Sequence, residues 1–399
     1  MRVLFVSDDP DDIRIGAVKA PRRLAEALRA QGCDCDLLFR DDLGPHPKHD
    51  RLRLGTSPWL AWRAVVRAWR ERGPYDVIDA AGPEGFALGL LRRFSPYRRA
   101  RLIVRSHGLE RLFFRGLIED HYAGFVRKEW YRRLLFPLTR CTQEAGAYRL
   151  ADAAIVLNRE ELDLVIARRW KRPGEVHLVP HGVVGERWAE APPPDTPRGA
   201  GVLFSGHWTT GKGVHYLAEA HRRLLNEGLP LPLTLLSGME DPPDFPAEEA
   251  AIRRAFAPAC QPLLTVLPRL NDQDAVFDLY RRHDLLVFPS SVEAFGLVVL
   301  EALSQRLPVI CSRSVGASDF LRDEVDALVV PSRDAAALAH ALRRLWCDPA
   351  LRRRLAEAGY LAVGDFTWTR AAQATLQVYA HAGGMARRQA LSAPAAGGG

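Results

Sequence analysis

DLLVFPSSVEAFGLVVLEA, the stretch from residue 284 to residue 302, reads as a strand, a turn and a helix. The apolar run 285–288, which follows Asp284, is typical of a buried parallel strand. A proline and polar residues follow it, and the apolar residues 297–303 predict a helix that begins near Gly296. A strand that leads through a short turn into a helix is the repeating unit of α/β folds with a parallel sheet.

The same alternation extends over most of the chain. In the first half, strands are predicted at 3–7, 35–39, 76–80, 101–105, 153–157 and 176–179. In the second half, they are predicted at 201–205, 233–236, 263–266, 285–288 and 309–311. Helical patterns separate most of these strands, which argues for parallel sheets that are covered on both faces.

A proline-rich segment divides this alternation into two halves. Residues 192–197, PPPDTP, can continue neither a helix nor a central strand. We therefore expect an α/β fold with two Rossmann-like domains that face each other across a cleft. The predicted parts are an N-terminal domain at 1–190, a linker at 191–198, a C-terminal domain at 199–366, a last amphipathic helix at 367–382 and a disordered tail at 383–399.

The composition is that of a globular protein. Hydrophobic residues make up 47% of the 399 residues and charged residues 26%. No stretch has the roughly 20 consecutive apolar residues of a membrane helix. The N-terminal apolar run meets Asp8 and Asp9 too early for a signal peptide, so we expect a cytoplasmic protein. The six cysteines show no metal-site spacing and are expected to be reduced thiols.

The net charge of +7 comes almost entirely from arginine. This bias fits either the coding composition of the gene or an attraction to anions such as a nucleotide diphosphate or an acidic lipid surface. No nucleic-acid-binding motif is present, so no nucleic-acid partner is expected. Residues 59–70 and 113–138 are basic and aromatic. They fit either a peripheral contact with an anionic membrane or aromatic side chains packed inside a domain.

Two carboxylates flank the predicted start of the helix in the opening stretch. Glu293 precedes the turn, and Glu301 lies inside the helix. The first N–H groups of the helix, at 295–298, have no partner within it and favour a phosphate group. Carboxylates accept hydrogen bonds from paired hydroxyl groups, such as those of a sugar or a ribose. The alternative is an ordinary strand–turn–helix with two surface glutamates.

A glycine-rich loop, FSGHWTTGKG at 204–213, follows the first predicted strand of the second half. Its glycines let the backbone approach an anion closely, and Lys212 adds a positive charge. A Walker P-loop would have Ser or Thr where Gly213 stands, so ATP hydrolysis is not expected. The alternative is a glycine-rich turn with a solvated lysine.

These two segments resemble glycosyltransferase family 4. The family has two glutamates separated by seven residues, with Phe-Gly after the first, and Glu293, Phe295-Gly296 and Glu301 match this pattern. The family also has a glycine, five residues and Lys-Gly, which residues 206–213 match. His207 stands where the family usually has arginine, a change that weakens the second phosphate contact.

The resemblance implies a role for each residue that matches. Glu293 would bind the donor sugar, Lys212 the diphosphate and Glu301 the ribose, and Glu293 and Lys212 would also take part in catalysis. The implied donor-binding set is Gly16, Gly206, His207, Lys212, Leu270, Glu293, Phe295, Gly296, Leu297 and Glu301.

Three positions match the family more loosely. His107 follows the predicted strand 101–105, in a region where family members have a histidine, so the resemblance implies a catalytic role. Gly16 lies in the loop after the first strand, where relatives have a glycine loop, and Leu270 lies where the family contacts the base. The acidic residues 8–12 are expected to be solvated or to meet a polar acceptor, with metal binding as the alternative.

The resemblance implies a GT-B fold whose last helix crosses back to the first domain. It implies transfer of a glycosyl group from a nucleoside-diphosphate sugar with retained anomeric configuration and without a metal or other cofactor. UDP- and GDP-sugars are the expected donors, and the acceptor is open among a glycan, a lipid-linked compound and a natural product. Two alternatives remain, a catalytically silent protein that binds nucleotide sugars or glycans and a sugar-nucleotide epimerase.

Overall fold

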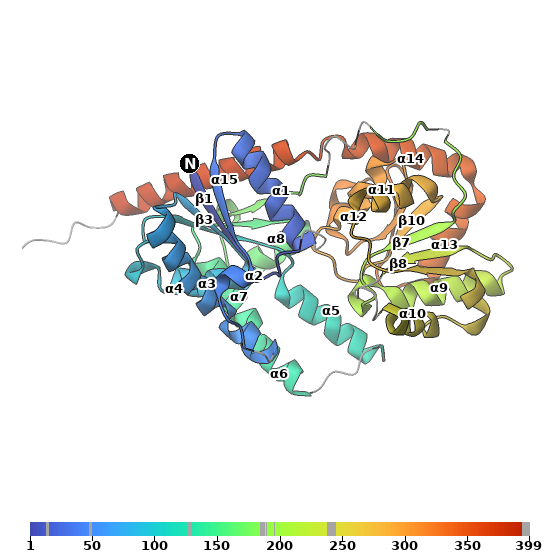
Figure 1. Cartoon of the computed structure of the whole chain (residues 1–399), viewed down its shortest axis with the longest axis horizontal. Coiled ribbons are helices and arrows are strands. Elements are labelled where there is room, and N and C mark those ends of the chain that lie inside the picture. Colours follow the sequence, from blue (N-terminus) through green and yellow to red (C-terminus); the bar gives the residue numbers. More distant parts are fainter. Residues whose placement is uncertain are drawn as a thin grey trace, which may run out of the picture. The chain divides into compact units, whose positions relative to one another are not determined.

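The computed structural model describes residues 1–12, 16–47, 50–125, 130–183, 188, 190–194, 196–237 and 245–392. They form two compact units (Figure 1). Unit 1 consists of Met1–Phe114, Glu129–Gly182 and Trp368–Gly399, and unit 2 consists of Arg115–Lys128 and Val183–Thr367. This division differs from the predicted boundaries, because residues 115–128 and 183–190 belong to unit 2.

Unit 1 is built on a six-stranded parallel sheet with the order β2-β1-β3-β4-β5-β6. Its strands are β1 (Arg2–Val6), β2 (Asp34–Leu38), β3 (Val77–Ala81), β4 (Arg101–Arg105), β5 (Ala153–Val156) and β6 (Val176–Leu178). The central strands β3 and β5 are buried along their whole length. A parallel strand that is covered on both faces accounts for such continuous burial.

The helices of unit 1 occupy the segments between these strands, as the predicted alternation requires, except for α15, which follows unit 2 in the sequence. They are α1 (Gly16–Ala30), α2 (Arg40–Leu43), α3 (Asp50–Arg72), α4 (Gly85–Leu90), α6 (Trp130–Leu138), α7 (Arg140–Leu150), α8 (Arg159–Ala167) and α15 (Trp368–Ser392). Helix α5 (Glu110–Tyr122) has residues in both units. Within the described part of the chain, no helix combines the length and the apolarity that a membrane crossing requires.

Unit 2 has a second parallel sheet of six strands with the order β12-β11-β10-β7-β8-β9. Its strands are β7 (Val202–Ser205), β8 (Leu233–Leu236), β9 (Leu264–Leu267), β10 (Leu285–Phe288), β11 (Val309–Ser312) and β12 (Leu328–Val330). The first five were predicted, with shifts at their ends. The prediction missed β12, because three apolar residues show no period that separates a strand from a loop.

The helices of unit 2 alternate with its strands. They are α9 (Val214–Asn226), α10 (Phe245–Arg254), α11 (Gln273–Arg282), α12 (Leu297–Ser304), α13 (Ala335–Cys347) and α14 (Pro349–Val363). Helix α12 is buried over Val299–Ser304 and directly follows the turn after β10. The sheet and its helices enclose one apolar core that includes Phe204, Val287 and Leu342.

The last helix, α15, returns to unit 1, as we predicted (Figure 1). It packs beside α1, and its residues Ala372 and Tyr379 belong to the core of unit 1. The predicted disordered tail from residue 383 was wrong in part, because α15 continues to Ser392. The alanine, arginine, glutamine and leucine residues after Gly384 favour a helix enough to outweigh two glycines. Residues 393–399 lie outside the described part of the chain.

A buried ion pair connects α15 to the sheet of unit 1. The guanidinium of Arg105 on β4 lies 2.7 Å from the carboxylate of Asp79 on β3, and both side chains are almost fully buried. The Tyr379 hydroxyl donates to the same carboxylate over 2.6 Å. A buried charge pair is stable only when its remaining hydrogen-bonding positions are filled. Tyr379 therefore both completes the pair and fixes the position of α15.

Candidate functional site

The glycine-rich loop of unit 2 and the turn after β10 pack backbone against backbone. Gly213 has a left-handed φ of 71°, and a Cβ atom there would lie 1.9 Å from the carbonyl oxygen of Pro289. Beside it, the N–H of Ser291 donates to the Gly211 carbonyl over 2.8 Å. Only glycine allows both this φ and this approach, so position 213 fixes how the two loops meet.

This packing brings two predicted residues together. The ammonium group of Lys212 forms an ion pair with the carboxylate of Glu293, and both side chains are partly accessible. The same ammonium group lies 5.3 Å from the centroid of the Phe288 ring. A partly accessible lysine whose carboxylate partner is also partly accessible can exchange that partner for an anionic ligand.

The N-terminus of α12 lies directly after Glu293 in the same turn. Gly296 is the N-cap residue with φ of 88°, and no side chain caps the helix. A Cβ atom at Gly296 would lie 2.7 Å from the Val315 side chain, so this position also needs glycine. Phe295 is buried, and its carbonyl accepts a hydrogen bond from Ala317. The N–H groups that begin α12, from Leu297 on, have no acceptor within the helix, and donors of this kind can bind an anion.

Glu301 lies inside α12 and has a tyrosine partner that we did not predict. The hydroxyl of Tyr280 on α11 lies 3.2 Å from Glu301 Oε2. Tyr280 is fully buried, and this burial, together with the charge of Glu301, raises the pKa of the phenol well above its usual value. The phenol therefore stays protonated and donates to the carboxylate.

Arg198 fixes the two helices that carry this pair. Its guanidinium donates to the carbonyl oxygens of Tyr280 and His283, at the end of α11, and of Gln305 and Arg306, at the end of α12. Cations at helix C-termini satisfy carbonyl groups that have no partner inside the helix. No pattern in the sequence distinguishes Arg198 from the many other arginines.

The remaining predicted residues of unit 2 lie at the ends of strands. Gly206 follows β7 with φ of 154°, and half-buried His207 comes next. Leu270 lies after β9, one of the two edge strands of the sheet. These three positions thus belong to loops that follow strands, where ligands gather in open α/β sheets.

In unit 1, the predicted His107 lies beside an aspartate that follows β1. His107 Nδ1 is 3.5 Å from Asp9 Oδ2, and the Ser7 hydroxyl donates to the same oxygen over 2.5 Å. Burial acts to raise the pKa of Asp9, but its contacts with His107 and Ser7 outweigh burial and lower it. Asp9 is therefore an ionised carboxylate beside the imidazole of His107.

The other acidic residues near Asp9 have separate partners. Asp8 pairs with Arg40 over 3.3 Å, and Asp11 pairs with Arg22. Among the described residues, no group of three side chains is arranged to hold a metal ion. The predicted Gly16 is exposed at the start of α1, and residues 13–15 before it lie outside the described part of the chain.

A buried glutamate holds the loop that carries His107. Glu161 on α8 accepts hydrogen bonds from the Ser106 hydroxyl over 2.8 Å and from the Leu109 N–H over 3.2 Å. Burial raises its pKa to about 7. Gly108, between them, has φ of 119° and donates to the Ser106 hydroxyl oxygen. Glu161 thus fixes the backbone on both sides of the imidazole.

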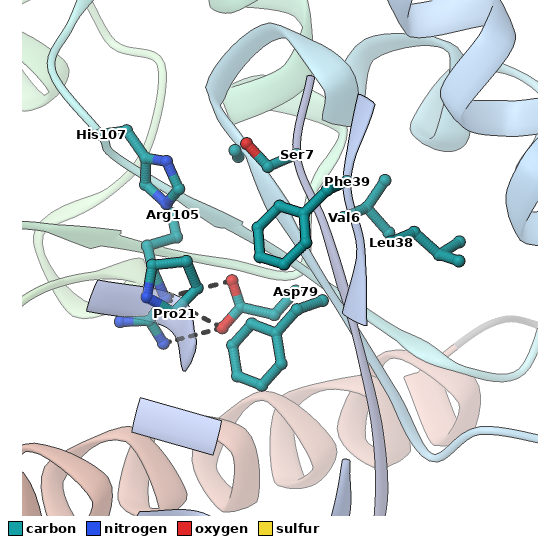
Figure 2. Close-up of a pocket in the computed structure, with 10 residues that line it drawn as sticks. Val6, Ser7, Pro21, Leu38, Phe39, Asp79, Arg105 and His107 are labelled. Carbon is teal, nitrogen blue, oxygen red and sulfur yellow. Dashed lines mark hydrogen bonds and ion pairs between the residues drawn. The ribbon is translucent and has the colours of Figure 1, made fainter. Parts of the chain in front are cut away.

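Figure 2 shows His107 above the Arg105–Asp79 ion pair at a small cavity. Ser7 and Phe39 line other parts of its wall. Its volume of about 10 Å³ gives room for roughly one water molecule. Unit 1 by itself therefore offers a histidine beside an aspartate and no pocket of substrate size at this place.

Comparison with known proteins identifies the family of this chain. The sequence profile described as "Glycosyltransferase Family 4" matches residues 16–187, and the one described as "Glycosyl transferases group 1" matches residues 194–362. A glycogen synthase of Mycobacterium tuberculosis is 30% identical over 95% of this chain and 94% of its own length. The chain belongs to glycosyltransferase family 4.

Other relatives of this family 4 chain differ in how much they share with it. A D-inositol 3-phosphate glycosyltransferase of Xylanimonas cellulosilytica is 29% identical over 62% of the chain, and the match spans 61% of that relative. Sucrose-phosphate synthase of Thermosynechococcus elongatus has the same fold, with a TM-score of 0.72 over 96% of this chain and 99% of that one, at 24% identity. Anabaena HepE, solved with UDP-glucose, gives a TM-score of 0.63 over 95% and 100% of the two chains at 16% identity.

We predict that Gly213→Ala destabilises the family 4 chain by roughly 2 to 4 kcal/mol, because the new methyl group meets the Pro289 carbonyl and the left-handed φ is unfavourable for alanine. Urea unfolding monitored by circular dichroism measures the change. The matched control is Gly211→Ala, since a Cβ atom at Gly211 meets nothing within 4 Å. Equal stability of the two variants would contradict the packing described for these loops.

Proposed function

We propose that this chain transfers a glycosyl group from a nucleoside-diphosphate sugar to an acceptor and that unit 2 holds the donor. The observation that carries this proposal is the meeting of Lys212, Glu293 and the uncapped N-terminus of α12 in one place. Lysine and helix N–H groups together stabilise a diphosphate, first as ligand and then as leaving group. Because both are part of the protein, the proposed reaction needs no metal ion and no other cofactor.

In this proposal, different residues of unit 2 bind different parts of the donor. Lys212, Gly206, His207 and the N–H groups of Phe295, Gly296 and Leu297 bind the diphosphate. Glu293 leaves Lys212 when the donor arrives and accepts hydrogen bonds from the sugar hydroxyls. Glu301 binds the ribose, and Tyr280 positions its carboxylate. Leu270 contacts the base. The complex of Anabaena HepE with UDP-glucose supports a UDP-sugar as donor, and a GDP-sugar is the second choice.

Retention of the anomeric configuration is part of the proposal. The acceptor hydroxyl attacks from the face that the diphosphate leaves, and a phosphate oxygen takes its proton. His107, held by Asp9, stabilises the reacting sugar on this path. Glycosyl transfer to a supplied acceptor, followed by NMR of the product's anomeric proton, tests this point.

The acceptor is proposed only as a class. Relatives are named for glycogen synthesis and for an inositol phosphate acceptor, so a hydroxyl of a glycan or of a phosphorylated polyol is the first choice. A lipid-linked acceptor or a natural product is the second choice, and a lipid-linked acceptor would agree with a peripheral contact at an anionic membrane.

A catalytically silent nucleotide-sugar binder is the second candidate function. His207 favours it, since the arginine usual in the family would give a stronger phosphate contact. Slow hydrolysis of a bound donor distinguishes the two candidates, because a silent binder leaves the donor intact. An epimerase would instead return an altered nucleotide sugar.

We predict that Lys212→Ala weakens binding of the matching nucleoside diphosphate about 10- to 100-fold, since a charge-assisted hydrogen bond contributes roughly 1.5 to 3 kcal/mol. Isothermal titration calorimetry measures the affinity. The matched control, Arg353→Ala, removes an exposed positive charge on α14. An unchanged affinity of the Lys212 variant would show that Lys212 does not bind the phosphates.

We expect Tyr280→Phe and Glu301→Ala to weaken binding of the ribonucleotide and to leave the 2′,3′-dideoxy nucleotide nearly unaffected. The reason is that both substitutions act through the ribose hydroxyls, with a loss of about tenfold for Glu301→Ala. Tyr360→Phe is the control, because the Tyr360 ring stacks on Trp188, elsewhere in unit 2. Equal losses for both nucleotides would mean that Glu301 does not contact the ribose.

His107→Ala and Asp9→Asn should lower turnover of the donor by roughly 100-fold or more with little change in donor affinity, since their proposed role is at the reacting sugar. Steady-state hydrolysis or transfer gives the rate, and calorimetry gives the affinity. His340→Ala is the control, because His340 lies on α13 of unit 2 and has no proposed part in the reaction. If affinity and turnover fall together, His107 is a donor-binding residue instead.

A further inference from the structure

A basic groove of about 520 Å³ lies on unit 1 between α3 and the short helix η2 (Arg92–Phe94). Arg63, Arg67 and Arg70 of α3 line it together with Trp62 and Phe94. We name it the α3–η2 groove. It is separate from the residues proposed to bind the donor and from His107.

The three arginines give the groove a strong positive charge. They follow one another at intervals of four and three residues, so they share one face of α3. Each is exposed. Arg67 donates to the Asp42 carbonyl, and in the described part of the chain no acidic side chain pairs with Arg63 or Arg70. Glu71 is the one acidic residue among those that line the groove.

An unusually exposed aromatic side chain accompanies this charge. Phe94 is 89% exposed, and Leu90, at the end of α4, is 48% exposed. The backbone on either side of Phe94 is fixed, because the Ser95 hydroxyl accepts from Trp62 Nε1 over 3.0 Å and donates to the Leu91 carbonyl over 2.9 Å. Phe94 is therefore held outward by its neighbours, beside the arginines. Large apolar side chains in such positions mark surfaces that meet a partner.

We propose that the α3–η2 groove binds the surface of a membrane that contains anionic phospholipids. Arginines at a membrane surface pair with lipid phosphate groups, and Phe94 of the groove, with exposed Leu90 four residues before it, can enter the region of the acyl chains. A nucleic acid fits less well, because its bases stack on aromatic side chains and offer nothing to the aliphatic Leu90. This proposal does not depend on the proposed donor site, so an experiment can contradict one of the two proposals and leave the other standing.

The test is sedimentation of the full chain with vesicles of phosphatidylcholine, with and without phosphatidylglycerol. We expect binding only to the anionic vesicles and a decrease with added salt. Arg63→Gln combined with Arg70→Gln should lower the partition coefficient by about tenfold or more. Phe94→Ser, which changes no charge, should lower it by several-fold.

The control combines Arg168→Gln and Arg353→Gln, which removes the same charge from two other exposed positions. Thermal unfolding verifies that all variants are folded. A normal partition coefficient for this control, with losses in the groove variants, supports the proposal. Equal losses in both double variants would mean that net charge alone drives binding, and absent binding of the wild type to anionic vesicles would also overturn the proposal. Binding of the wild type to an oligonucleotide but not to vesicles would likewise overturn the proposal.

Discussion

The contact between Gly213 and the Pro289 carbonyl is the constraint on which the site in unit 2 depends. It lets the loop after β7 and the turn after β10 lie backbone to backbone, which no residue with a side chain would allow at that φ. Because the two loops lie this close, Lys212 and Glu293 form an ion pair. Their pair lies just before the residues that begin α12 in the same turn as Glu293. Two glycines, Gly213 and Gly296, thus determine the geometry of the site, and this geometry sets where the charged groups lie.

Elsewhere in the structure, buried polar groups fix the positions of loops and helices. In unit 1, Glu161 fixes the backbone around His107, and the Arg105–Asp79 pair with Tyr379 fixes α15 on the sheet. A buried polar group is costly unless it is satisfied, so such groups impose one arrangement on the elements that they join. In unit 2, half-buried Arg198 joins the ends of α11 and α12 in a similar way.

The sequence allowed the site residues on one turn to be predicted, and it did not allow their partners to be predicted. Glu293, Gly296 and Glu301 lie within nine residues of one another, so a strand–turn–helix pattern suffices to relate them. Tyr280 is 21 residues away from Glu301, and Asp9 is far from His107 in the sequence, so only the folded sheet order brings each pair together. The disordered tail predicted from residue 383 is wrong in part, because the helix formers after Gly384 continue α15 to Ser392.

The central claim of this account is that unit 2 binds the diphosphate of a nucleotide through protein groups alone. Calorimetry with each common nucleoside diphosphate and its parent nucleoside, in excess EDTA, tests it most directly. The account predicts that one diphosphate binds at least about 100-fold more tightly than its nucleoside, since several charge-assisted hydrogen bonds depend on the phosphates. Equal binding of nucleoside and diphosphate, or binding of the diphosphate that EDTA abolishes, would contradict it.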